Sequence, residues 1–409
     1  MKRKPLYKRV FKVVRDIVTL RKLRKKIKLL ISVKGLRKYI QNIEANNSDR
    51  VVYIFQHQFF DRSGETCYNG GAERYCQDLA NLLHQNNYQA ILIQIGSSKK
   101  GVWERKVGHL KIIGLPIDDR VVYVNILKLF KKYEFVIYSG AVDWEEKIHP
   151  NILISHGITW DNPNNKEPIK NICKIFFDVD CLVSVDTNTI SWLRTTFPIS
   201  FDKMAMNYIP NYVDTSVYKP IKKAKSSKIQ ITFPRRASPE RGYWLISQSL
   251  PAIMEKYSSV IFNFVGFAHK NKIIEDIQKL AAKFPGRINH YVCDPNEMSK
   301  IYQKSDISLI PTLYAEGTSL SCLEAQACGN VVISTNIGGL PNLIIDGYNG
   351  ILINPDGQEL MNALDRVLAS KELCERLSKN AVSVAQAFDK KIWMRRWEAV
   401  IKSVAEEKK

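Results

Sequence analysis

Two successive series of short apolar runs, separated by segments with helical periodicity, constrain the fold of this chain more than any other feature. In the first series, the runs that predict strands cover residues 50–55, 89–96, 110–115, 135–140, 151–157 and 181–186. In the second series they cover residues 229–234, 260–266, 288–293, 306–312 and 331–334. The clearest helical patterns between them cover residues 72–86, 242–257 and 270–284. Strands that alternate with helices in this way predict an α/β fold with parallel sheets covered by helices on both faces.

A change of composition between the two series predicts a domain boundary. The segment 208–228 contains two prolines followed by a polar, basic run, and 409 residues are enough for two hydrophobic cores. We therefore expect two Rossmann-like, doubly wound domains, over residues 49–212 and 213–389. A helix over 390–409 is expected to cross back to the first domain. Ligands of such sheets bind at the carboxyl ends of the strands, so the pattern predicts two domains that face a central, ligand-binding cleft.

Residues 1–48 form a separate, basic arm. Residues 1–40 contain sixteen Lys and Arg and one acidic residue, which accounts for +15 of the formal net charge of +21. Apolar residues recur at helical spacing from Leu6, Val10 and Val13 onward, and this pattern predicts a basic amphipathic helix. Charges interrupt the apolar residues too often for a transmembrane span or a signal peptide. We expect the arm to bind an anionic membrane surface; a nucleic-acid-binding arm and a solvated or partner-binding helix are the alternatives.

The stretch 306–339 carries the strongest chemical signal in the chain. Its first strand leads into a turn, and Thr318 or Ser319 is placed to cap the helix that follows. Gly329 then ends the helix in the manner of a C′ glycine. Because the free N–H groups at a helix start attract anions, we expect a phosphate beside residues 317–320.

Two glutamates, Glu316 and Glu324, stand on either side of this helix start. Glu324 lies inside the helix, where a carboxylate is placed to bind a sugar diol with two hydrogen bonds. Glu316 precedes the helix at the expected edge of the cleft, where charge in a reacting sugar or acceptor would be met. The spacing alone also fits a helix with two solvated glutamates.

Further candidates follow other expected strands. Arg236 and Arg241 come after the first strand of the second series, where arginines clamp a diphosphate with charge-assisted bonds, although surface charge is the alternative. Gly70 and Gly71 precede the first helix and permit the close approach of a phosphate, but they lack a full dinucleotide fingerprint. His156 ends a buried strand, where a histidine is either structural or functional. Neither the cysteines nor the histidines show metal-ligand spacing.

The order of these motifs resembles one family, the retaining GT4 glycosyltransferases with a GT-B fold. The motifs are "GGAERY" (70–75), "SHG" (155–157), "IPNYVDTSVYKP" (209–220), "RRASPERG" (235–242), "EGTSLSCLEAQACGNVVISTNIGG" (316–339) and "DGYNGILINPDG" (346–357). The resemblance spans residues 50–397. One departure is Gly317-Thr318-Ser319, which stands where many members have Gly-Phe-Gly or a similar aromatic triplet.

The resemblance implies a role for each candidate residue. Glu316 and His156 would act beside the donor sugar and the reaction centre. The remaining residues would bind the donor's phosphates, sugar and ribose: Gly70, Gly71, Arg236, Arg241, Gly317, Thr318, Ser319, Leu320 and Glu324. The family retains the anomeric configuration and needs no metal and no cofactor.

The resemblance and the arm together imply a function. We expect a metal-independent hexosyl or deoxyhexosyl transferase that uses a UDP-, GDP- or dTDP-linked sugar. The acceptor would be lipid-linked or a glycan in bacterial lipopolysaccharide, other surface polysaccharide or glycolipid biosynthesis. The protein would be cytoplasmic and peripheral on the inner face of the membrane, without a nucleic-acid partner. A non-catalytic scaffold on this fold, a sugar-nucleotide epimerase and a phosphorylase are the alternatives.

Overall fold

The computed structural model places most of the chain beyond the arm. It describes residues 35–45, 50–68, 70–94, 101–115, 126–140, 146–196, 204–223, 226–268 and 270–406. Within the arm only the helix over 35–45 is described, and its Leu36, Ile40 and Ile43 are buried. The amphipathic helix expected over residues 1–34 lies outside the described residues. In the described part, no helix is both long enough and apolar enough to cross a membrane.

The first sheet has eight strands in the order β3-β4-β2-β1-β5-β6-β7-β8. The strands are β1 (Val51–Gln56), β2 (Gln89–Gln94), β3 (Trp103–Val107), β4 (Leu110–Gly114), β5 (Phe135–Ser139), β6 (Asn151–Ser155), β7 (Cys181–Ser184) and β8 (Ala205–Tyr208). Where pairing is described it is parallel, as for Val51 opposite Gln89, except that β3 runs antiparallel to β4. The sequence pattern did not predict β3 or β8.

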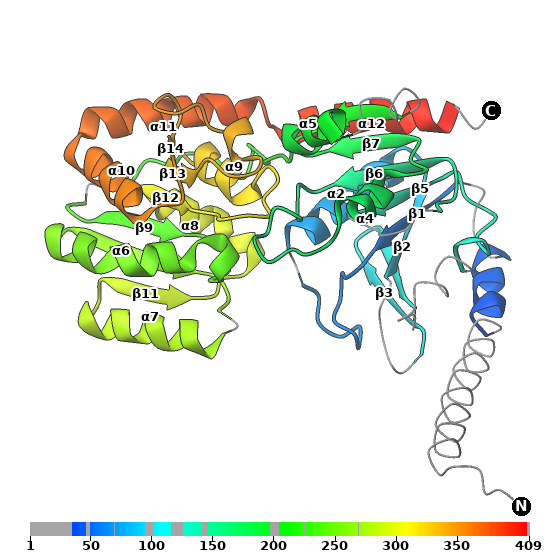
Figure 1. Cartoon of the computed structure of the whole chain (residues 1–409), viewed down its shortest axis with the longest axis horizontal. Coiled ribbons are helices and arrows are strands. Elements are labelled where there is room, and N and C mark those ends of the chain that lie inside the picture. Colours follow the sequence, from blue (N-terminus) through cyan, green and yellow to red (C-terminus); the bar gives the residue numbers. More distant parts are fainter. Residues whose placement is uncertain are drawn as a thin grey trace, which may run out of the picture. The chain divides into compact units, whose positions relative to one another are not determined.

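The second sheet has six strands in the order β11-β10-β9-β12-β13-β14 and is parallel throughout. The strands are β9 (Ile229–Phe233), β10 (Val260–Val265), β11 (Ile288–Tyr291), β12 (Ile307–Ile310), β13 (Val331–Thr335) and β14 (Ile351–Ile353). Strands β1, β2, β4 to β7 and β9 to β13 occupy the predicted runs, so the predicted alternation is confirmed (Figure 1). Strand β14 was not predicted.

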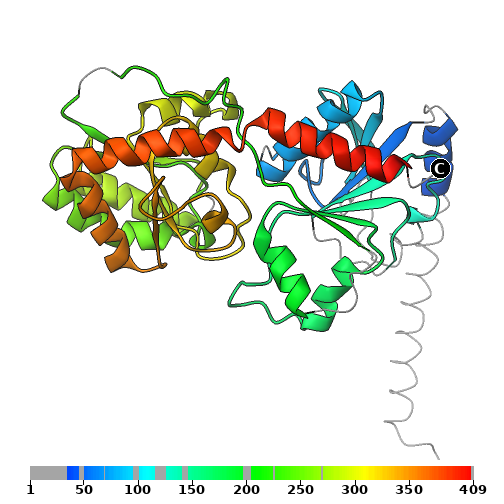
Figure 2. The ribbon, with the colours of Figure 1, turned by 90° about the horizontal axis from the view of Figure 1, so that it is seen from above.

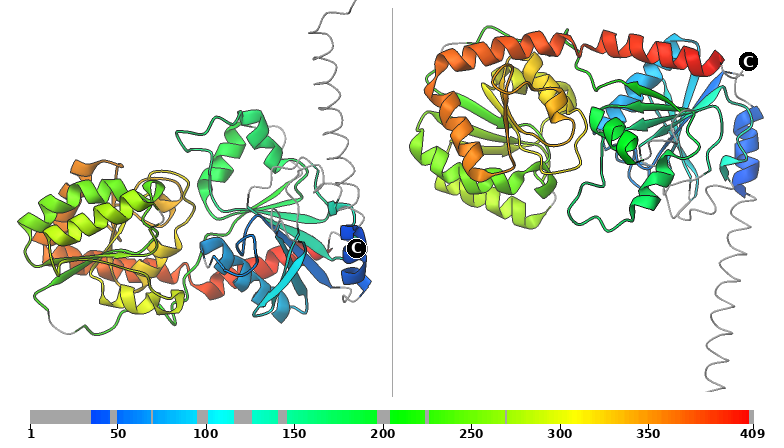
Figure 3. Two further views of the ribbon diagram at one scale, coloured as in Figure 1. Left: turned by 90° about the horizontal axis from the view of Figure 1, so that it is seen from below. Right: turned by 45° about the horizontal axis from the view of Figure 1, so that its top comes forward.

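Alternate residues of the second sheet enter two separate cores. Ile231 and Leu309 pack on one face with α6 (Tyr243–Lys256), α7 (Asn271–Lys283) and α10 (Gly357–Ala369). Ile310 and Val332 pack on the other face with α8 (Met298–Lys304) and α9 (Leu320–Ala327). Figure 3 shows α6 and α7 side by side on their face of the sheet. Helices therefore cover both faces, as the doubly wound pattern predicts.

The remaining helices complete the fold. They are α2 (Gly71–Gln85), α4 (Ile169–Cys173), α5 (Thr187–Thr196), α11 (Lys371–Gln386) and α12 (Lys390–Glu406). Helix α12 follows α11 after a short break (Figure 2). Its buried Trp397 donates an indole N–H to the hydroxyl of Tyr75 in α2 at 2.7 Å, and the rings of Trp393 and Tyr75 meet edge to face.

Contacts divide the chain into two compact units. The first unit has Met1–Tyr68, Gln77–Ile137 and Trp144–Asn151, and the second has Asn69–Cys76, Tyr138–Asp143 and Ile152–Lys409. The predicted boundaries at 48, 212 and 389, and the cleft between the domains, stay predictions. Every contact of the candidate site described below lies within the second unit.

Candidate active site

The helix start predicted at 318–320 is present in the structure. Ser319 is the N-cap of α9, and its hydroxyl accepts a hydrogen bond from the N–H of Cys322 at 3.4 Å. Thr318, the other candidate cap, instead donates its hydroxyl to the carbonyl of Val185 at 2.7 Å. Gly329 follows the C-cap with φ +78°, which is the predicted C′ position. The free N–H groups at the start of α9 therefore lie where the sequence predicted an anion site.

Glu316 lies immediately ahead of this helix and is the acceptor of a buried network. Its Oε2 accepts from Arg241 Nη1 at 2.5 Å, from Arg235 Nη2 at 2.8 Å and from the Thr312 hydroxyl at 2.7 Å. Thr312 in turn accepts from Arg235 Nη1 at 2.5 Å. Only 8% of the Glu316 side chain is exposed. Burial opposes ionisation, but the two guanidinium groups outweigh it and hold the pKa of Glu316 below its usual value, so the carboxylate is charged.

Close backbone packing fixes the loop that carries Glu316. A Cβ on Gly317 would lie 2.5 Å from the carbonyl oxygen of His156, and one on Gly338 would lie 2.1 Å from the carbonyl oxygen of Glu316. A Cβ on Gly339 would lie 2.5 Å from the carbonyl carbon of Gly317. Three segments that are distant in sequence meet here without side chains between them. Asn211 adds a hydrogen bond from its N–H to the Thr318 hydroxyl at 2.9 Å.

Glu324 lies in α9, and its carboxylate already has a cationic partner. Arg74 Nη2 donates to Glu324 Oε1 at 2.6 Å, and the exposed fractions of the two side chains are 31% and 5%. Burial and the nearby Glu324 carboxylate both raise the pKa of the Tyr218 hydroxyl. Glu324 is therefore a buried acceptor and not a solvated surface glutamate, in contrast to the alternative that the sequence left open.

The glycine pair Gly70-Gly71, at the start of α2, lies against the start of α9. A Cβ on Gly71 would be 3.2 Å from Leu320 Cδ1, and one on Gly70 would be 2.5 Å from Glu73 Oε2. Arg236 is exposed, and its charge favours the ionised form of Glu73, although burial raises the pKa of Glu73 overall. Gly71 and Leu320 are thus in contact, and Arg241 is bound to Glu316.

His156 directly follows β6, beside the Glu316 loop. Its Nε2 lies 3.0 Å from the Ser139 hydroxyl, and its ring meets the Tyr75 ring edge to face at a centroid distance of 5.2 Å. Burial lowers the pKa of His156 to about 4, so the imidazole is neutral near pH 7. The neutral imidazole of His156 can therefore donate or accept a hydrogen bond, but it adds no positive charge to the site.

The depressed pKa of His156 predicts that the free energy of unfolding decreases as the pH falls from about 6.5 to about 4. In this range the unfolded chain binds a proton that the folded chain does not. The loss is on the order of 3 kcal/mol at most. Urea unfolding of His156→Asn should show a weaker pH dependence than the wild type. His57→Asn, at an exposed position, is the control, and equal pH dependence in wild type and His156→Asn would contradict the assignment.

Two functional candidates were missed by the sequence reasoning. Arg235, which follows β9, binds Glu316 and was not among the predicted residues; the predicted role of its neighbour Arg236 at the diphosphate stays a prediction. Asp161 accepts the N–H of Ala315 at 3.0 Å and 3.2 Å with its two oxygens. Ala315 has a φ of +56°, which is uncommon for a residue other than glycine. Asp161 therefore holds the residue directly before Glu316.

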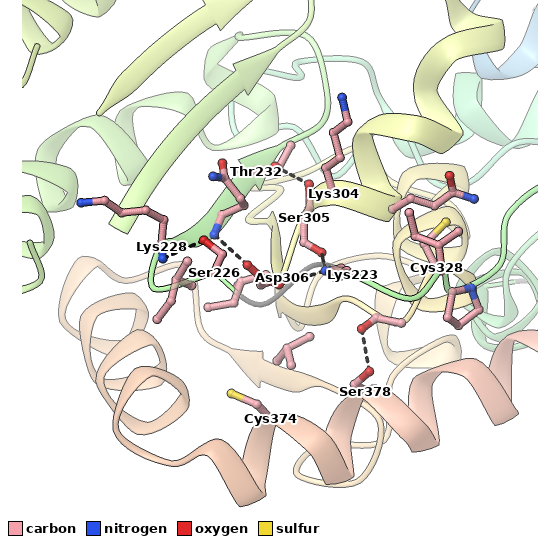
Figure 4. Close-up of a pocket in the computed structure, with 18 of the residues that line it drawn as sticks. Lys223, Ser226, Lys228, Thr232, Lys304, Ser305, Asp306, Cys328, Cys374 and Ser378 are labelled. Carbon is pink, nitrogen blue, oxygen red and sulfur yellow. Dashed lines mark hydrogen bonds and ion pairs between the residues drawn. The ribbon is translucent and has the colours of Figure 1, made fainter. Parts of the chain in front are cut away.

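A large hollow lies at the other end of the second sheet. Its volume is about 1350 Å³, and its lining includes Lys228 and Asp306 at the amino ends of β9 and β12 (Figure 4). Lys223 Nζ contacts Asp306 Oδ1 at 2.9 Å across it. Arg235 and Thr312 follow the carboxyl ends of the same strands, so this hollow is distinct from the Glu316 site. Among the described residues, no group of three or more His, Cys, Asp and Glu is placed to hold a metal ion.

Comparison with known proteins supports this reading of the motifs. Residues 214–384 match the family model described as Glycosyl transferases group 1. The D-inositol 3-phosphate glycosyltransferase of Segniliparus rotundus is 24% identical over 211 residues, which cover 48% of this chain and 45% of that relative. The chain thus spans about half the length, or less, of the curated relatives it matches. These matches confirm the predicted resemblance to glycosyltransferases.

Solved structures show the fold. Sucrose-phosphate synthase from Thermosynechococcus elongatus has a TM-score of 0.68 at 17% identity, and the match covers 87% of this chain and 98% of that one. HepE from Anabaena, in complex with UDP, has a TM-score of 0.65 at 14% identity, and the match covers 87% of this chain and 100% of that one. The chain therefore has the GT-B fold, with two Rossmann-like domains, as the motif order implied.

Proposed function

We propose that this protein is a retaining, metal-independent glycosyltransferase that moves a sugar from a nucleotide-sugar donor to an acceptor. The observation that carries the proposal is the buried, ionised Glu316, which Arg235 and Arg241 hold directly ahead of the N-terminus of α9. The match of residues 214–384 to the group 1 family supports the same reaction. HepE has been solved with UDP and with UDP-glucose, which supports a nucleotide-sugar donor here, whether UDP-, GDP- or dTDP-linked.

The proposed mechanism is electrostatic. The bond between the anomeric carbon and the diphosphate breaks, and the nucleoside diphosphate leaves with the bonding electrons. The acceptor hydroxyl attacks the same face of the sugar and passes its proton to an oxygen of the leaving diphosphate, so the configuration is retained. Arg236, Arg241 and the N–H groups of Gly317 to Leu320 would stabilise the charge that develops on the diphosphate. Glu316 would stabilise positive charge on the sugar.

The other candidate residues would position the donor. Gly70 and Gly71 let the diphosphate approach the backbone, and Glu324 accepts hydrogen bonds from the ribose hydroxyls. The neutral His156 would donate or accept a hydrogen bond at the donor sugar. Exclusion of water from the site would favour transfer of the sugar over its hydrolysis.

The acceptor in this proposal is lipid-linked, and the protein works at the cytoplasmic face of a membrane. The support is the charge of +15 in residues 1–40, because basic amphipathic segments bind anionic lipid surfaces. An acceptor confined to the membrane would make such an anchor useful. Surface polysaccharide or glycolipid synthesis is the process that fits this arrangement, with a hexosyl or deoxyhexosyl group as the transferred sugar.

Removal of residues 1–34 should lower transfer to a vesicle-borne lipid acceptor by an order of magnitude or more, since each basic residue near an anionic surface contributes about 1 kcal/mol. The cut spares the helix over 35–45, whose Leu36 and Ile40 are buried. Nucleotide affinity should not change, which serves as the control for folding. Full activity of the truncated chain on vesicles containing phosphatidylglycerol would contradict the role of the arm.

A thermal-shift panel tests the donor site itself. The full chain would be heated with UDP, GDP, dTDP, ADP or CMP. A ligand present at about 100 times its dissociation constant stabilises the fold by roughly 2.7 kcal/mol, which is readily measured. We expect one nucleoside diphosphate to give the largest shift. The absence of a shift with every nucleotide would favour a non-catalytic scaffold.

A further inference from the structure

The ion pair between Arg74 and Glu324 joins two segments that are 250 residues apart in sequence. Arg74 lies in the first turns of α2 and Glu324 in the second turn of α9. The guanidinium Nη2 is 2.6 Å from Glu324 Oε1, and only 5% of the glutamate side chain is exposed. The Glu324 carboxylate raises the pKa of Arg74, which keeps the guanidinium charged. A pair this short and this buried is a strong contact.

Leu320 and Tyr218 lie near the ion pair. Gly71 packs on Leu320 one turn away, where a Cβ would come within 3.2 Å of Leu320 Cδ1. Burial raises the pKa of the hydroxyl of the half-buried Tyr218. The Glu324 carboxylate raises this pKa further and Arg74 lowers it, so Tyr218 lies near both charges. A ribose diol needs both hydroxyls hydrogen-bonded to the carboxylate, and one of the carboxylate oxygens is already occupied by Arg74.

We propose that Arg74 competes with the donor ribose for Glu324, so that a ribonucleotide must displace the guanidinium and the ion pair reduces the preference of the site for ribonucleotides over 2′,3′-dideoxynucleotides. This inference rests on the proposed function, in which Glu324 binds the ribose. A diol offers two hydrogen bonds and displaces the guanidinium from the carboxylate. A ligand that lacks both hydroxyls offers none, so the ion pair stays closed. Arg74 is thus a specificity-determining residue, because it contests the carboxylate that would bind the ribose.

The test compares Arg74→Gln with the wild type in calorimetric titrations of UDP, GDP and ADP and of their 2′,3′-dideoxy counterparts. We expect Arg74→Gln to bind the ribonucleotide about tenfold more tightly, because the competitor is gone, which corresponds to ~1.4 kcal/mol. Affinity for the dideoxy nucleotide should stay within about twofold. Arg366→Gln, at an exposed position of α10, is the matched control and should change neither affinity.

Two further variants keep the inference testable if Arg74→Gln does not fold. Arg74→Lys keeps the positive charge but loses the planar guanidinium, so it should raise the affinity for the ribonucleotide by less than Arg74→Gln does. In a Glu324→Gln background, Arg74→Gln or Arg74→Lys should produce no gain, because the contested carboxylate is absent.

The outcomes separate the inference from the proposed function. If the wild type binds a ribonucleotide but Arg74→Gln binds it equally or more weakly, competition is wrong and the donor site stands. An equal gain in affinity for ribonucleotide and dideoxy nucleotide would also overturn the inference, since the diol would not be the group that competes with Arg74. If neither wild type nor variant binds any of the nucleotides, the proposed donor site fails, and the inference fails with it.

Discussion

Glu316→Ala should lower the free energy of unfolding by about 3–5 kcal/mol, the usual cost of removing one partner from a buried ion pair. The carboxylate is the shared acceptor for Arg235, Arg241 and Thr312. Without it, two guanidinium groups face each other, and only 10% of the Arg235 side chain is exposed to water. Chemical denaturation of the purified variant measures the loss.

Glu316→Gln separates stability from chemistry. Its amide oxygen still accepts a hydrogen bond, so we expect a smaller loss of stability, about 1–3 kcal/mol. The negative charge is gone, however, and sugar transfer should fall by about 10²- to 10³-fold, as for other groups that stabilise developing charge. Glu375→Ala is the control, because 68% of that side chain is exposed on α11. Normal transfer by folded Glu316→Gln would remove Glu316 from the mechanism.

Arg241→Ala should weaken binding of the nucleoside diphosphate about a hundredfold, or ~2.7 kcal/mol. Arg241 is the arginine of the predicted pair that reaches Glu316, and 23% of its side chain is exposed, so one side of the guanidinium is accessible to a phosphate. Because the nucleoside has no phosphate, its affinity should change by less than about threefold. Calorimetric titrations with UDP and with uridine make this comparison. If another base binds, the titrations use its nucleoside diphosphate and its nucleoside instead.

Arg241→Lys is the matched variant for this prediction. It keeps the charge but loses the forked geometry, so it should recover a part of the diphosphate affinity and not all of it. Equal weakening of UDP and uridine by Arg241→Ala would show that the arginine supports the loop through Ala315 and Glu316 instead of binding phosphate.

The sequence predicted the parts of the fold that depend on local pattern. Apolar runs identified most strands because buried parallel strands are apolar on both faces. Strand β3, "WERKV", is an exposed antiparallel edge strand and carries no such signal. Strand β14 has three residues, which is too short for a pattern. The cap, predicted at Thr318 or Ser319 and found at Ser319, and the C′ glycine at Gly329 were predictable because capping depends on nearby residues alone.

The site was predictable only where a motif was local. Arg235 and Arg236 both follow the end of β9, and both faces of that strand are buried, so strand alternation does not distinguish them. Asp161 and Ala315 are 154 residues apart, and no local pattern announces a contact across that distance. The same holds for Arg74 and Glu324. Such pairs are set by the tertiary fold and became visible only in the structure.

The most direct test of the central claim is whether the full chain consumes a nucleotide sugar. The protein would be incubated with UDP-, GDP- and dTDP-linked sugars and with bacterial lipid extract in vesicles, beside Glu316→Gln. Release of nucleoside diphosphate and the anomeric proton signal of the product would be followed by NMR. We predict that one donor is consumed only when acceptor is present, with retained configuration, and that Glu316→Gln is nearly inactive. Binding of a nucleotide without consumption of any donor, or equal turnover by Glu316→Gln, would contradict a transferase centred on Glu316.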